Sequence, residues 1–166
     1  TYTSGNYISS TTKTYYVKNG TTLTLTSIYT VPTESVAGNF KGYSTSTSST
    51  TAATLSTTNP TIANNDTTTY YMWFNRSTFA VTVTKPTNGS VKAETVTKTG
   101  NSVTASSSAA TLTVKYGDTV KATATANTGY SFTGWSGGYV SGTTNPVTGG
   151  TVTAAKTITG SFKQTN

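Results

Sequence analysis

Apolar and polar residues alternate along much of this chain. The alternation is clearest in four segments where polar residues, mostly threonine, stand at every second position: residues 21–31, 79–84, 111–115 and 119–126. A period of two with many β-branched residues is typical of strands that have one face in a core and one face in water. The pattern therefore predicts a mainly β fold with little or no helix. The best helical candidate, residues 32–39 (PTESVAGN), would make two turns at most.

Two Asn-Gly pairs stand between apolar runs, at Asn19-Gly20 and Asn88-Gly89. Because these residue types tolerate positive φ at both central positions of a two-residue turn, each pair predicts a β-hairpin. The stretches 44–58 and 136–150 are rich in glycine, serine and threonine, and we expect loops or irregular strands there.

The second half of the chain repeats the first half in three blocks and in the same order. The matches are VKNGTTLTL (17–25) with VKYGDTVKA (114–122), FKGYS (40–44) with FTGWS (132–136), and DTTTYYMWF (66–74) with AAKTITGSF (154–162). Three ordered matches predict a tandem repeat of about eighty to ninety residues. We therefore predict two small β modules, residues 1–77 and 78–166.

Each module contains a motif in which a glycine separates two aromatic residues. A small β domain needs a few large aromatics in its core, since each can bury roughly 150 Å² or more. The glycine would let another backbone or ring approach closely, and a bulge beside it would turn both aromatics inward. We predict a structural role for the motif residues and the phenylalanines that close each repeat: Phe40, Gly42, Tyr43, Phe74, Phe132, Gly134, Trp135 and Phe162. The alternative is an exposed aromatic platform for a glycan.

The composition helps mainly by excluding classes of function. Lysine and arginine number 11 against 4 acids, for a formal charge of +7, but the basic residues are scattered. A nucleic-acid-binding protein usually concentrates its charge on one face, so we expect no nucleic-acid partner. Weak attraction to anionic cell-wall or cell-surface polymers is the alternative. The sequence has no apolar run of about 18 residues, so membrane insertion is not expected.

We expect no catalytic residue, no cofactor and no metal. The sequence has neither cysteine nor histidine, which excludes disulfides, Ser-His-Asp catalysis and the usual ligands of zinc. Glu34, Asp66, Glu94 and Asp118 stand singly, whereas glycoside hydrolysis needs two carboxylates across a cleft. Residues 64–69 (NNDTTT) are the candidate calcium loop, with an ordinary Asx turn as the alternative. Glu34 and Glu94 are also candidate acids for an intramolecular isopeptide bond, with no particular lysine indicated.

Two aromatic residues are candidates for ligand binding. Tyr139 follows the second motif in a glycine-rich segment and has no counterpart in the first module. Trp73 alternates with Met72 and Phe74, so one side of that segment is expected to face outward. An outward Trp73 would stack on a sugar or pack against the next domain.

Together these motifs resemble the internalin-type B-repeat family, also called Listeria–Bacteroides repeats. Residues 117–162 hold a Phe-x-Gly-Trp-Ser motif after a Gly-Tyr pair, an Asn-Pro pair and a closing KTITGSF, and are similar to the divergent branch of the family. Residues 19–74 are similar to the main branch, with Tyr43 where tryptophan is usual. They also carry Met72 and Trp73 before the closing phenylalanine.

The resemblance implies a compact, mainly β module likened to the ubiquitin-type β-grasp. Such modules are strung in arrays on secreted or surface-anchored bacterial proteins, without catalytic machinery. The first expected function is therefore a non-catalytic spacer or stalk, whose partners are neighbouring repeats of the same polypeptide. The second is an adhesive module for a glycan, a cell-wall polymer or a host surface protein. The third is a subunit or segment of a fibre or phage appendage. We take the chain as a piece of a longer polypeptide located outside the cell.

Overall fold

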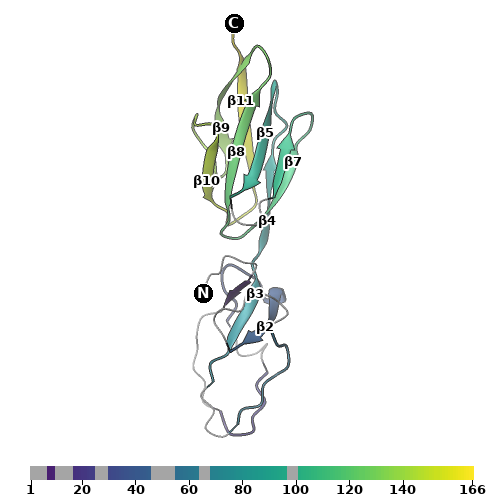
Figure 1. Cartoon of the computed structure of the whole chain (residues 1–166), viewed down its shortest axis with the longest axis vertical. Coiled ribbons are helices and arrows are strands. Elements are labelled where there is room, and N and C mark those ends of the chain that lie inside the picture. The colour runs from purple at the N-terminus through teal and green to yellow at the C-terminus, as the bar shows by residue number, and fades with distance from the viewer. Residues whose placement is uncertain (1–6, 10–16, 25–29, 46–54, 64–67, 97–100) are drawn as a thin grey trace. The chain divides into compact units, whose positions relative to one another are not determined.

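The computed structural model describes six stretches of the chain: residues 7–9, 17–24, 30–45, 55–63, 68–96 and 101–166. The chain divides into two compact units, Thr1–Ser77 and Thr78–Asn166 (Figure 1). All but one of the described elements are β-strands. The predicted mainly β class is therefore confirmed, while the finer β-grasp arrangement stays a prediction.

The single helical element in the described stretches is η1, a 3-10 turn at Ala37–Asn39. It lies in the segment predicted to be helical, residues 32–39, which otherwise forms turns closed by hydrogen bonds over three residues. The side chains of Ser35 and Asn39 both donate to the backbone oxygen of Asn75. These contacts with a distant strand favour a turn over the two α-helical turns that the local sequence allows.

The described strands of the first unit form one antiparallel sheet in the order β1-β3-β2, with bounds Tyr7–Ser9, Tyr71–Asn75 and Phe40–Ser44. On the central strand β3, Met72, Trp73 and Phe74 are 7%, 1% and 0% exposed. Successive residues of a strand point to opposite faces, so both faces of β3 are covered. The prediction that one side of this segment faces outward is wrong, because buried residues lie on both faces of β3.

The second unit is built from two four-stranded sheets. One sheet has the order β10-β8-β5-β6, with bounds Val147–Thr151, Thr119–Ala126, Gly89–Thr95 and Ser102–Ala105. The other has the order β7-β4-β11-β9, with bounds Ala110–Lys115, Thr78–Val83, Lys156–Gln164 and Tyr130–Gly137. β4 and β11 run parallel, and the other described strand pairs of these sheets are antiparallel.

The two sheets of the second unit share one hydrophobic core. Leu112 and Ile158 enter it from one sheet, and Val91 and Val120 enter it from the other. Along β8, every second residue from Val120 to Ala124 is buried, while the residues between them are more exposed. This is the alternation that the sequence predicts for a strand with one face in a core.

The Asn88-Gly89 pair does not close the predicted hairpin. It connects β4 to β5, and these two strands lie in different sheets. Asn88 has the expected positive φ, at 68°. However, β4 is bonded on one side to β7 and on the other to β11, so neither of its edges is open to β5. The pair therefore turns the chain from one sheet to the other.

The earlier Asn-Gly pair does form a turn. Gly20 has a φ of 81°, and the Thr21 amide donates to the Lys18 oxygen at 3.0 Å. The next residue, Thr22, makes an antiparallel bridge with Thr61. Residues 14–16, which belong to the predicted partner strand, lie outside the described stretches.

Candidate functional site

The first unit places its aromatic motif on β2, opposite β3. Phe40 pairs with Phe74, and the register then shifts so that Lys41 is an extra residue before Gly42. Such a bulge reorients neighbouring side chains, and the rings of Phe40 and Phe74 lie 5.4 Å apart. Gly42 has a φ of +134°, and a Cβ there would lie 2.7 Å from the backbone oxygen of Ser56. Glycine is therefore required for this close approach of two backbones.

The second unit repeats this arrangement on β9 and β11. Phe132 pairs with Phe162, and Thr133 is the extra residue before Gly134. The centroid of the Phe132 ring lies 5.9 Å from that of Phe162 and 4.8 Å from that of Trp135. All three aromatics pack in or against the core of the unit.

Hydrogen bonds beside the two motifs also correspond. The Tyr43 amide donates to the Ser56 oxygen, and the Trp135 amide donates to the Gly142 oxygen, both at 2.8 Å. In each unit the motif strand is thereby bridged on its other side by a later segment of the chain.

The turns of the first repeated block correspond as well. The Gly20 amide donates to the Ile62 oxygen at 2.8 Å, and the Gly117 amide donates to the Val152 oxygen at 2.9 Å. In both units the acceptor residue donates back to the residue after the glycine, at 2.9 Å. The repeated residues therefore hold the same backbone framework in each unit. Their aromatic side chains are buried or half-buried, which does not favour an exposed aromatic platform.

One repeated string carries a contact that the sequence comparison missed. The letters TTNP occur at 57–60 and again at 143–146, so an identity search over four residues would have found them. In the second unit, the Asn145 side chain accepts from the Ala124 amide and donates to the Ala124 oxygen, both at 2.9 Å. Val147 pairs with Ala122, so Asn145 occupies the next ladder position and bonds β8 with its side-chain amide.

Tyr139 fixes its glycine-rich segment to the loop before β11. Its hydroxyl donates to the Ala154 oxygen at 2.5 Å and accepts from the Ala154 and Thr153 amides at 2.9 and 3.1 Å. The ammonium of Lys156 lies 4.9 Å from the centroid of its ring. The hydroxyl and one ring face are thus engaged within the unit, and the ring is half-buried against the core. These contacts explain the residue by structure, and ligand binding by Tyr139 stays a prediction.

Trp73 does not have the outward position on which its ligand role depended. It is 1% exposed, and its Nε1 donates to Ser44 Oγ at 2.9 Å. Both faces of the ring are covered, so stacking on a sugar would require the unit to open.

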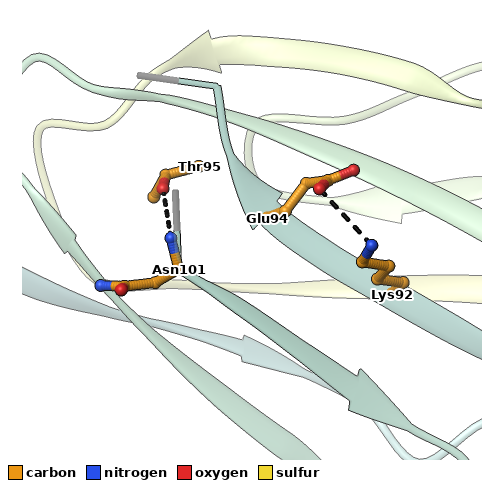
Figure 2. A network of polar contacts seen from close by, with 4 residues as sticks. All are labelled: Lys92, Glu94, Thr95 and Asn101. Atoms are coloured by element: carbon orange, nitrogen blue, oxygen red, sulfur yellow. Dashed lines mark hydrogen bonds and ion pairs between the residues drawn. The ribbon is translucent and has the colours of Figure 1, made fainter. Parts of the chain in front are cut away.

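Glu94, one of the candidate acids for an isopeptide bond, forms an ordinary surface ion pair. Lys92 and Glu94 point from β5 and form an ion pair at 3.6 Å, with side chains 48% and 30% exposed (Figure 2). An exposed pair of this kind contributes about 1 kcal/mol or less. Beside it, the Asn101 amide donates to Thr95 Oγ1 at 2.9 Å (Figure 2). The Thr95 amide also donates to the Asn101 oxygen, at 3.0 Å. These contacts join the end of β5 to the start of β6.

Metal binding gains no geometric support from the described part of the chain. Within that part, no three residues of the types His, Cys, Asp and Glu lie together. Residues 64–67 of the candidate calcium loop fall outside the described stretches. Among the residues described, no helix has the length and apolar character needed to cross a membrane.

In comparisons with known proteins, no family model, no curated protein and no solved structure matches this chain.

Proposed function

We propose that this chain is a non-catalytic structural part of an extracellular bacterial surface protein, in which two tandem β modules serve as a spacer or stalk. The observation that carries this proposal is that the motif strand pairs in the same register in both units. Phe40 lies opposite Phe74 in the first unit, and Phe132 lies opposite Phe162 in the second. A motif that recurs with the same backbone contacts is explained by what each module needs in order to fold. No ligand is required to account for it.

The outward positions of the second unit support the same proposal. Thr111, Thr82 and Thr157 stand in register on the neighbouring strands β7, β4 and β11. Threonine has high β propensity and a short side chain that hydrates readily. A module that spaces other domains stays in solvent along its length, and a surface of this kind suits that role.

The test is a binding screen of the whole chain against bacterial cell walls, host glycans and mucins at physiological salt. The proposal expects no saturable binding. Weak binding that disappears at raised salt is the expected effect of the +7 charge and leaves the proposal standing. Saturable binding that persists at raised salt would overturn it in favour of an adhesive module. Concentration-dependent assembly in sedimentation measurements would overturn it in favour of a fibre or appendage subunit.

A further inference from the structure

The first and last strands of the second unit lie side by side and run parallel. In the β4–β11 pair, Val83 stands opposite Ile158. Because the strands point the same way, the chain enters the unit at Thr78 at one end of the sheet and leaves it after Gln164 at the other end (Figure 1). A force that separates the entry from the exit therefore acts along the strands.

Both strands are internal to their sheet. β4 is bonded to β7 along its whole length, and β11 is bonded to β9 over most of its own. A load that separates the two strands shears the β4–β11 hydrogen bonds along their length, and withdrawing either strand alone from the sheet also shears its bonds to the outer neighbour. The side chains of Val81, Val83 and Ile158 are fully buried, and a slip by one residue would turn them to the solvent face. Core packing thus opposes the same movement as the hydrogen bonds.

The first unit has the opposite geometry at its two ends. β1 runs antiparallel to β3, and Tyr7 lies directly opposite Asn75. Among the described residues of this unit, the strand residues nearest its two ends are therefore paired with each other. A load that separates them opens the β1–β3 hydrogen bonds one after another, starting at the loaded end. Since a single hydrogen bond has modest net strength, sequential opening needs less force than concerted shear.

We propose that the second unit is a force-bearing element, with the parallel β4–β11 pair as its mechanical clamp, and that the first unit extends at lower force. This inference rests on the proposed spacer function, because a stalk between two attachment points carries tension. It adds that the two units differ in mechanical strength: the first unit unfolds at low force, and the second unit stays folded at that force.

The test is to pull single molecules of the whole chain through handles attached at residues 1 and 166. We expect two unfolding events, which release roughly 250 Å of extended chain from the first unit and roughly 280 Å from the second. The event of the second unit, which has the larger length gain, is expected at a severalfold higher force than that of the first. Forced unfolding reports the rate of crossing the unfolding barrier, so the comparison is made at one pulling speed. Equal forces for the two events would overturn the proposal.

A second pulling direction provides the control. The chain has no cysteine, so an introduced pair offers unique attachment points. Ala80 and Thr113 are exposed and lie opposite each other on β4 and β7. In the variant Ala80→Cys/Thr113→Cys, handles at these positions pull across the sheet and open bonds in sequence. We expect a severalfold lower unfolding force than in the end-to-end direction. Unchanged thermal unfolding of the reduced variant would show an intact fold, and equal forces in both directions would exclude the clamp.

The two proposals fail separately, because pulling requires no ligand. Saturable binding together with a strong second unit would overturn the spacer function and leave the clamp. Absence of binding together with a second unit that yields as easily as the first would overturn the clamp and leave the spacer function.

Discussion

Gly137 on β9 lies so close to the backbone oxygen of Thr157 on β11 that a Cβ at position 137 would collide with it. The same oxygen accepts a hydrogen bond from the Gly138 amide at 3.0 Å. Gly137 also has a φ of +103°. Both the contact and the backbone conformation therefore require glycine at this position.

We predict that Gly137→Ala lowers the unfolding free energy of the second unit by about 3 kcal/mol or more. The strain of a positive φ and the collision with the Thr157 oxygen both contribute to this loss. Gly150→Ala is the matched control, since Gly150 on β10 has open space around its Cα and no positive φ. The control is expected to stay within about 0.5 kcal/mol of the parent. Urea unfolding measures both, and equal effects of the two substitutions would contradict this account of Gly137.

Tyr139→Phe removes the hydroxyl that bonds Ala154 and Thr153 but keeps the ring. Two amides and one carbonyl lose their partner, so we predict a loss of about 1–3 kcal/mol in unfolding free energy. The control is Tyr130→Phe, at a tyrosine whose hydroxyl has no hydrogen-bond partner among the described residues. If the two variants unfold at the same urea concentration, the hydroxyl of Tyr139 does not stabilise the fold.

Asn145→Ala should weaken the edge of β8, because both backbone groups of Ala124 lose their hydrogen bonds to the Asn145 amide. We expect a loss of about 1–2 kcal/mol, near the net value of two partly exposed hydrogen bonds. Hydrogen exchange at the Ala124 amide is the local readout, and it should accelerate in the variant. Exposed Thr143→Ala in the same loop is the control, and slow exchange at Ala124 in both variants would refute the prediction.

Ser44→Ala leaves the buried indole N–H of Trp73 without its acceptor. An unsatisfied buried donor costs about 1–3 kcal/mol, so the first unit should unfold at lower urea. The two tryptophans, Trp73 and Trp135, lie one in each unit, and their indole signals in nitrogen-15 NMR report the units separately. The urea midpoint of unfolding reported by the Trp73 signal should fall, while the midpoint reported by the Trp135 signal should stay the same. The exposed neighbour Thr45, changed to alanine, should move neither signal.

Several features of the site followed from local sequence. The glycine between two aromatics predicted a close approach and a bulge, and both occur at Gly42 and at Gly134. The pairing of Phe40 with Phe74 was not visible in advance, because antiparallel register depends on residues more than thirty positions apart. The Asn145 contact was missed for a related reason: the repeated TTNP string is short, and the bond joins it to β8.

The alternation of apolar and polar residues by itself determined the β class and the buried side of strands such as β8, since neighbouring side chains of a strand point to opposite faces. Tertiary structure alone decided which strands pair and which strands are covered on both faces. Asn88-Gly89 has hairpin chemistry, yet it joins two sheets because β7 and β11 occupy both edges of β4. Trp73 stands at an alternate position, yet it is buried, because both faces of β3 are covered. The local pattern sets which side of a strand is apolar. Contacts between segments far apart in the chain decide which residues cover the apolar face of a strand, and whether its opposite face is covered as well.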